Sequence, residues 1–276
     1  MQYITLNDGV RIPQLGYGVW QVPDAQAHES VAAALEIGYR HIDTAAAYEN
    51  EAGVGRAVAE SGLVREEVFL TTKLWNANQG YDATLRAFDR SLELLGTEYV
   101  DLYLIHWPVP EQDLYIESWR ALEKIASDGR ARAVGVSNFT AETLDRLLKE
   151  GTRTPAINQI ELHPYFPQAA MREYNRKHGI ATEAWSPLGQ GGDLLKEPLL
   201  TTLGDRYGKS PAQVVLRWHL QLGNVVIPKS VTPSRIRENF EVFDFELTPE
   251  EVDQITALGS DGGRIGPDPA TFNYTG

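Results

Sequence analysis

The sequence contains no cysteine among its 276 residues. Without a thiol, the chain can form no disulfide bond, no thiolate zinc site and no cysteine nucleophile. The absence also fits a reducing compartment, where disulfides rarely persist.

Basic residues are scarce. Lys and Arg number 25 against 38 Asp and Glu, which gives a formal net charge of −13 and a pI near 4.9. Non-specific binding to nucleic acid and adsorption to an anionic membrane surface both need a basic face. Neither a nucleic acid nor a membrane is therefore expected as a partner.

Long apolar runs are missing too. No stretch approaches the roughly 20 apolar residues that cross a bilayer. The first residues carry neither the basic nor the apolar region of a signal peptide, so the expected location is the cytoplasm. The 42% hydrophobic content is nevertheless enough for a sizeable core, which excludes a disordered chain.

Short apolar runs alternate with stretches of helical periodicity along most of the chain. Strands are expected at 15–20, 39–43, 68–73, 100–106, 133–137, 157–161, 182–185 and 225–228. Helices are expected at 25–37, 81–95, 114–127, 141–149, 168–177 and 211–222, followed by capping glycines at 38, 96, 129, 151, 179 and 223. This alternation favours a parallel sheet with helical crossovers, and eight repeats can close into a (β/α)8 TIM barrel.

The length admits either two domains of about 150 residues or one barrel of about 250. No linker divides the chain, so a single domain of residues 1–276 is expected. It would begin with a hairpin at 1–13, whose Asp8-Gly9 favours a type I′ turn. Residues 186–197 are glycine-rich and are expected to form a lid, whereas the tail at 259–276 is either a loop over the active-site face or disordered.

Polar residues stand where three neighbouring strands should end. Asp43, Lys73 and His106 end the second, third and fourth expected strands, and Tyr48 follows Asp43 in the same loop. Barrel enzymes carry catalytic groups at this rim. Each residue alone is more often structural, but burying Lys73 and His106 in apolar strands without a function would be costly.

These four side chains together can donate a proton. A tyrosine titrates near pH 10, and a neighbouring ammonium is expected to lower that pKa while a carboxylate keeps the ammonium in place. An imidazole beside the phenol would orient a carbonyl oxygen. Because no side chain supplies a hydride, such a site needs a nicotinamide cofactor.

The usual glycine fingerprint of dinucleotide binding is absent. The pairs Gly16/Gly18 and Gly53/Gly55 lack the third glycine, and the run at 189–192 has no glycine at the sixth position, so a Rossmann domain is not supported. The segment after the eighth strand is a better phosphate site. There Thr232 is a plausible N-cap and Pro233 a first helical residue, flanked by Lys229 and Arg235.

Three stretches make the sequence resemble the aldo-keto reductase family over essentially its whole length: GYRHIDTA at 38–45 running on to Gly55, AVGVSNF at 133–139, and the segment 229–239. Within the family it is most similar to short-tailed bacterial members of the 2,5-diketo-D-gluconic acid reductase type. The shared motifs are NDG at 7–9, QLGYGV at 14–19, LWN at 74–76, HWP at 106–108 and FDF at 243–245.

The resemblance implies a monomeric NADPH-dependent carbonyl reductase that uses no metal. It makes Tyr48 the general acid, assisted by Lys73 and Asp43, with His106 positioning the carbonyl. The implied cofactor-binding residues are Ser137, Asn138, Gln159, Trp185, Ser186, Leu188, Gly189, Lys229, Ser230, Val231, Arg235, Glu238 and Asn239. Trp20, Trp75, His106 and Trp107 would line the substrate pocket, and the short tail favours small carbonyls such as diketo sugar acids or 2-oxoaldehydes.

Two alternatives stay open. Lys73 could form a Schiff base in a lyase, or the chain could be a cofactor-binding regulatory subunit. A metal hydrolase is less favoured, because the six histidines show no HExxH spacing.

Overall fold

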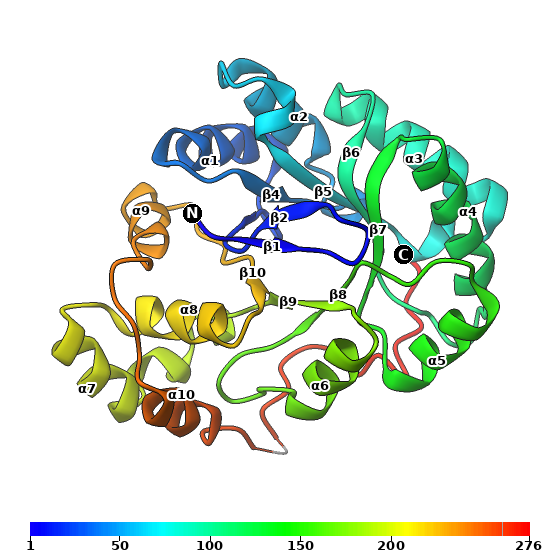
Figure 1. The fold of residues 1–276 in the computed structure, drawn as a ribbon. Coiled ribbons are helices and arrows are strands. Elements are labelled where there is room, and N and C mark those ends of the chain that lie inside the picture. Colours follow the sequence, from blue (N-terminus) through cyan, green and yellow to red (C-terminus); the bar gives the residue numbers. More distant parts are fainter. Residues whose placement is uncertain (261) are drawn as a thin grey trace.

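The computed structural model describes residues 1–260 and 262–276, and eight parallel strands form its centre (Figure 1). They are β3 (Tyr17–Gly18), β4 (His41–Asp43), β5 (Phe69–Leu74), β6 (Val100–Ile105), β7 (Ala131–Ser137), β8 (Ile157–Glu161), β9 (Ala181–Trp185) and β10 (Val225–Val226). Each strand pairs with its neighbour in chain order. A bridge from Leu15 to Val226 joins the two ends of the sheet. The predicted TIM barrel is confirmed.

Helices surround the barrel (Figure 1). They are α1 (Asp24–Ile37), α2 (Glu51–Glu60), α3 (Tyr81–Leu95), α4 (Tyr115–Ser127), α5 (Ala141–Glu150), α6 (Ala169–Lys177), α7 (Pro198–Tyr207), α8 (Pro211–Gln221), α9 (Pro233–Phe240) and α10 (Pro249–Thr256). Helices α2, α7 and α10 were not predicted. Within the described part of the chain, no helix has both the length and the apolar character needed to cross a membrane.

Helix α2 escaped prediction because it contains two glycines, which are poor helix formers. Both are required by packing. A Cβ atom on Gly53 would lie 2.2 Å from the carbonyl oxygen of Asp24 in α1, and one on Gly55 would lie 2.3 Å from that of Leu95 in α3. The backbone of α2 therefore comes so close to α1 and α3 that only glycine fits at these two positions, although glycine lowers the helical propensity of the segment.

The N-terminal hairpin covers one end of the barrel, where β1 (Tyr3–Thr5) pairs antiparallel with β2 (Arg11–Pro13) (Figure 1). Its Leu6 and Ile12 are buried against apolar side chains of the barrel strands. The predicted type I′ turn is wrong. The Gly9 N–H donates to the Leu6 carbonyl at 3.0 Å and only Gly9 of the turn has a positive φ, 87°. This pattern is a type I turn followed by a glycine bulge.

Five of the six predicted glycine caps have the expected positive φ, but Gly151 has a φ of −86°. Glycine is needed there for a different reason. A Cβ atom would lie 2.7 Å from the indole nitrogen of Trp119, which is fully buried in α4. The prediction at this position is therefore wrong, since close packing and not backbone conformation selects the glycine.

The approach of α2 to α3 yields a test of stability. Replacing Gly55 by Ala would ordinarily favour a helix by about 1 kcal/mol. Here the added methyl meets backbone, and overpacking of this kind costs about 1–3 kcal/mol. Thermal unfolding should show a lower Tm for Gly55→Ala and little change for Gly262→Ala, whose Cβ would meet nothing within 4 Å. A raised Tm for Gly55→Ala would contradict this packing.

Candidate active site

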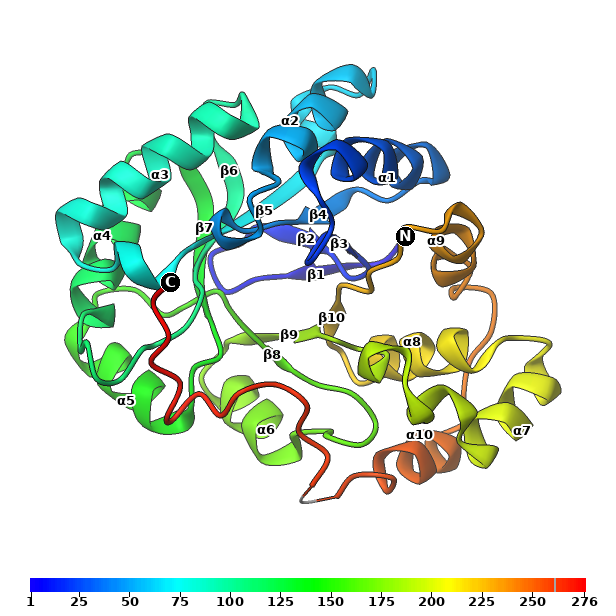
Figure 2. The same cartoon turned by 180° about the vertical axis from the view of Figure 1, so that it is seen from behind.

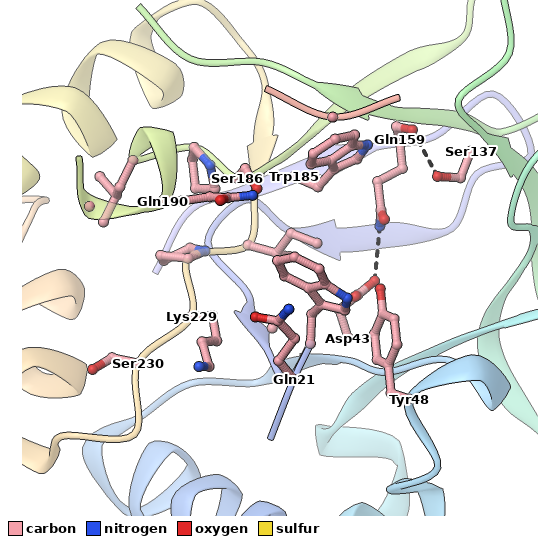
Figure 3. Close-up of a pocket in the computed structure, with 18 of the residues that line it drawn as sticks. Gln21, Asp43, Tyr48, Ser137, Gln159, Trp185, Ser186, Gln190, Lys229 and Ser230 are labelled. Carbon is pink, nitrogen blue, oxygen red and sulfur yellow. Dashed lines mark hydrogen bonds between the residues drawn. The ribbon is translucent and has the colours of Figure 1, made fainter. Parts of the chain in front are cut away.

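A cavity of about 1250 Å³ opens at the carboxyl ends of the strands. Its lining includes all of the residues predicted for catalysis, cofactor or substrate except two, Lys73 and Gly189. Lys73 is completely buried beneath the cavity. Gly189 belongs to the same short helix, η4 (Gly189–Gly191), as Gln190 and Gly191, which do line it. Figure 3 shows Asp43, Tyr48 and Gln159 on one side of the cavity and Gln190, Lys229 and Ser230 on the other.

The Lys73 ammonium is enclosed by three oxygen acceptors. Its Nζ lies 2.6 Å from Asp43 Oδ1, 2.9 Å from the Thr44 carbonyl and 3.5 Å from the Tyr48 hydroxyl. Since an ammonium has three hydrogens, every one of them has an acceptor. Strands β4 and β5 supply the ion pair, and the short helix η1 (Ala46–Tyr48) after β4 brings Tyr48 over it.

The charges of this cluster follow from burial and neighbours. Burial lowers the pKa of Lys73, but Asp43 and Tyr48 together outweigh it, so the pKa is raised and the ammonium stays charged. Burial raises the pKa of Tyr48, and the nearby Lys73 opposes that rise without cancelling it. The expectation that Lys73 brings the pKa of Tyr48 below its ordinary value is therefore wrong for this state, because loss of water costs the phenolate more. Tyr48 is a protonated phenol at neutral pH.

This arrangement argues against Schiff-base chemistry at Lys73. Attack on a carbonyl requires a neutral amine that reaches the substrate. Lys73 is charged, has an acceptor for each hydrogen and does not line the cavity.

His106 follows β6 and lines the cavity beside Tyr48, with ring centroids 5.7 Å apart and planes at 75°. Burial and, secondarily, Lys73 bring its pKa well below the ordinary 6.5. The ring is therefore neutral at physiological pH and has one N–H to donate.

A second polar cluster lies at the ends of β7, β8 and β9. The Ser137 hydroxyl donates to the Gln159 carbonyl at 3.0 Å, and the Trp185 indole donates to Asn138 Oδ1 at 2.8 Å. The Gln159 side-chain nitrogen donates to Asp43 Oδ2 at 2.9 Å (Figure 3). This last contact joins the second cluster to the Lys73 ion pair.

The far end of the cavity is basic. Helix α9 begins at Pro233 after an N-cap at Thr232, as predicted. Within the described residues neither Lys229 nor Arg235 forms an ion pair with an acidic side chain. Two such cations beside a helix N-terminus, in a chain of net charge −13, suit an anionic ligand such as a phosphate.

Aromatic side chains form the remaining wall. Trp20, Trp75 and Trp107 line the cavity, and Trp20 is 44% exposed. The tail reaches two of them, since Phe272 lies 4.4 Å from Trp107 and Tyr274 lies 6.2 Å from Trp75 between ring centroids. In Figure 2 the tail runs from α10 past α6 toward α4. The described part of the tail is therefore a loop over the active-site face.

Glu161 at the end of β8 holds the tail in place. Its two oxygens accept the backbone N–H groups of Ile265 at 2.5 Å and Gly266 at 2.8 Å. Gly266 packs on Trp185, where a Cβ atom would lie 2.5 Å from the ring. The contact joins the last part of the chain to the strand end that carries Trp185.

Sequence reasoning did not assign several residues that shape this site, among them Glu161, Glu183 and Gly266. Two carried a signal. Glu161 ends an expected strand, and the rule that selected Asp43 also applies to it. Glu183 is a charged residue in the middle of an apolar strand. Gly266 carried none, because its position depends on contacts with Glu161 and Trp185, which are distant in sequence.

Among the described residues no group of three His, Asp or Glu side chains could hold a metal ion.

The model of the Aldo/keto reductase family matches residues 13–260. This chain belongs to that family. An aldo-keto reductase of Mycolicibacterium smegmatis is 58% identical over 273 residues, which cover 99% of this chain and 98% of the relative. Glyoxal reductase of Bacillus subtilis is 52% identical and covers 96% and 95%. Methylglyoxal reductase DkgA of Yersinia pestis is 51% identical and covers 98% and 96%.

Solved structures of the family have the same fold. A variant of Gox0644 in complex with NADPH superposes with a TM-score of 0.95 at 46% identity, covering 99% of both chains. The protein is therefore an oxidoreductase of the aldo/keto reductase family.

The attachment of the reductase's tail can be tested. Glu161→Gln replaces one accepting oxygen by an N–H group, so one tail N–H loses its partner. Limited proteolysis should cut within 262–276 several-fold faster in this variant. Asn273→Ala, which removes an exposed contact to the Glu111 N–H, should change the rate little. Equal rates for Glu161→Gln and wild type would contradict the role of Glu161.

The same contact predicts a pH dependence. Burial opposes ionisation of Glu161, but the His163 ring and the two tail N–H groups outweigh it and lower the pKa below the ordinary 4.5. The stabilisation is therefore complete above pH 4.5 and is lost only as the pH falls through that lower folded value. Proteolysis of the wild-type tail should be constant from pH 7 to 5 and should accelerate only in stronger acid.

Proposed function

We propose that this protein reduces small aldehydes and ketones to alcohols with NADPH as the hydride donor. The observation that carries the proposal is a protonated Tyr48 held over the buried Lys73–Asp43 pair, in a cavity whose other end bears two cations without ion-pair partners in the described chain. The glyoxal and methylglyoxal reductases among its relatives support 2-oxoaldehydes as substrates. Diketo sugar acids remain a second class, with which the name DkgA is consistent.

The residues in and beside the cavity suit NADPH along its whole length. Ser137, Asn138, Gln159 and Trp185 would hold the nicotinamide, and Ser186, Leu188 and Gly189 the pyrophosphate. Lys229, Ser230, Val231 and Arg235 would hold the 2′-phosphate, with Glu238 and Asn239 at the adenine. When bound, the cofactor supplies the hydride that no side chain can. A monomer of one domain is the proposed active unit.

The protein's own part is proton transfer. The neutral His106 N–H and the Tyr48 hydroxyl can both donate to a carbonyl oxygen among Trp20, Trp75 and Trp107. As the carbonyl carbon is reduced, Tyr48 gives its proton to that oxygen. The Lys73 ammonium at 3.5 Å then stabilises the phenolate, and Asp43 keeps the ammonium in place.

Removing the phenolic hydroxyl tests this function. Tyr48→Phe should lower the turnover of methylglyoxal by about 10²–10⁴-fold, because general acid catalysis is lost. NADPH affinity, measured by fluorescence titration, should be nearly unchanged. Tyr103→Phe is a matched control, since the Tyr103 hydroxyl is buried and has no partner in the described structure.

Near-normal turnover by Tyr48→Phe would refute the assignment of the acid. A wild-type protein that binds NADPH and reduces none of a panel of aldehydes, ketoses and diketo acids would instead favour the regulatory-subunit alternative.

Cofactor choice provides a second test. Only NADPH carries a 2′-phosphate, and a charge-assisted hydrogen bond to it is worth roughly a tenfold to hundredfold change in affinity. Arg235→Ala should weaken NADPH binding by that factor and leave NADH binding unchanged. Arg237→Ala, on the same helix but outside the cavity lining, is the control. Equal losses for both cofactors would mean that Arg235 supports the loop and does not bind the phosphate.

A further inference from the structure

Beneath the cavity lies a carboxyl group that the proposed reaction does not use. Glu183 stands at the centre of β9 and is completely buried in the barrel interior. An ionisable group in such a place costs stability unless its contacts compensate. Its one hydrogen-bond partner in the described structure is Gln159 on the neighbouring strand β8, at 2.9 Å.

Gln159 contacts two carboxyl groups through one atom. Its Nε2 lies 2.9 Å from Asp43 Oδ2 and 2.9 Å from Glu183 Oε2. An amide nitrogen has two hydrogens, so each carboxyl receives one. Asp43 alone would hold the nitrogen but leave the amide plane able to turn about that single hydrogen bond. The second carboxyl fixes the plane.

With its nitrogen held by two carboxyl groups, the Gln159 amide has its oxygen Oε1 in a fixed direction. Gln159 Oε1 accepts no hydrogen bond from the described residues, and it is not among their buried unpartnered atoms. Because Gln159 lines the cavity, this oxygen is open to the cavity. We propose that Glu183 is a positioning residue, which fixes the Gln159 amide so that its oxygen faces the cavity and accepts the N–H of the nicotinamide carboxamide. This inference rests on the proposed function, because it requires NADPH in the cavity.

The charged and titratable groups around Glu183 indicate which protonation state its carboxyl group has. Asp43 and His41 face it from β4, with His41 Nε2 at 3.7 Å, and Lys73 faces it from β5. Burial and the charge of Asp43 raise the pKa of Glu183 to about 8, and burial lowers the pKa of His41 to about 3. At neutral pH both are mainly uncharged. The contact with Gln159 needs only an accepting oxygen, which glutamine also has.

Two variants and two cofactors separate positioning from a structural role. The 3-acetylpyridine analogue of NADPH has a methyl group where the carboxamide has its NH2, so it cannot donate to Gln159. Glu183→Leu should weaken NADPH binding about fivefold, the value of one neutral hydrogen bond, and leave binding of the analogue unchanged. Glu183→Gln should keep the wild-type preference for NADPH over the analogue.

Glu51→Leu is the matched control. Glu51 is another buried acid, 2% exposed, which accepts from Thr72 and does not line the cavity. It should leave the ratio of the two affinities unchanged. If Glu183→Leu does not fold, Glu183→Ala replaces it with the same expected ratio.

The inference is overturned if Glu183→Leu keeps the wild-type preference, if it loses affinity for both cofactors equally, or if wild type does not distinguish them. These failures differ from failure of the proposed function. Suppose the protein binds NADPH and reduces carbonyls, but substitution of Glu183 does not change its preference for NADPH over the analogue. That result would refute only the role of Glu183.

Discussion

The ion pair between Lys73 and Asp43 is the constraint on which the other polar groups of the cavity depend. A lysine with no exposed surface is tolerated only where its charge is compensated, and here Asp43, Thr44 and Tyr48 supply that compensation. Asp43 also accepts from Gln159, so the same carboxylate orders the groups on β8. The pair therefore determines where the phenol and the amide stand before any ligand arrives.

The tail adds a second set of contacts at the outer edge of the cavity. Glu161 binds two consecutive backbone N–H groups of the tail, and Trp75 and Trp107 receive its aromatic side chains. Residues nearly 200 positions apart thus form one wall: the Asn76 amide donates to the Tyr274 carbonyl at 2.8 Å. Trp20, which also lines the cavity, remains substantially exposed.

Much of the barrel could be predicted, because strand hydrophobicity and strand-end chemistry are local features of a chain. Asp43, Lys73 and His106 were found in this way, as was the start of α9. Features set by distant contacts were not found. The glycines of α2 meet backbone that is separated in sequence, and the net pKa of Tyr48 depends on how completely the fold removes water from it. Glu183 was overlooked although a charge within an apolar strand is visible in sequence.

The claim that a buried ammonium supports proton donation by Tyr48 is tested most directly by the turnover number of Lys73→Met at saturating NADPH and methylglyoxal. The account predicts a loss of several orders of magnitude with circular dichroism unchanged and a far smaller loss of NADPH affinity, because the phenolate loses its only nearby cation among the described residues. Turnover close to wild type would contradict it, since Tyr48 would then donate its proton without help from Lys73.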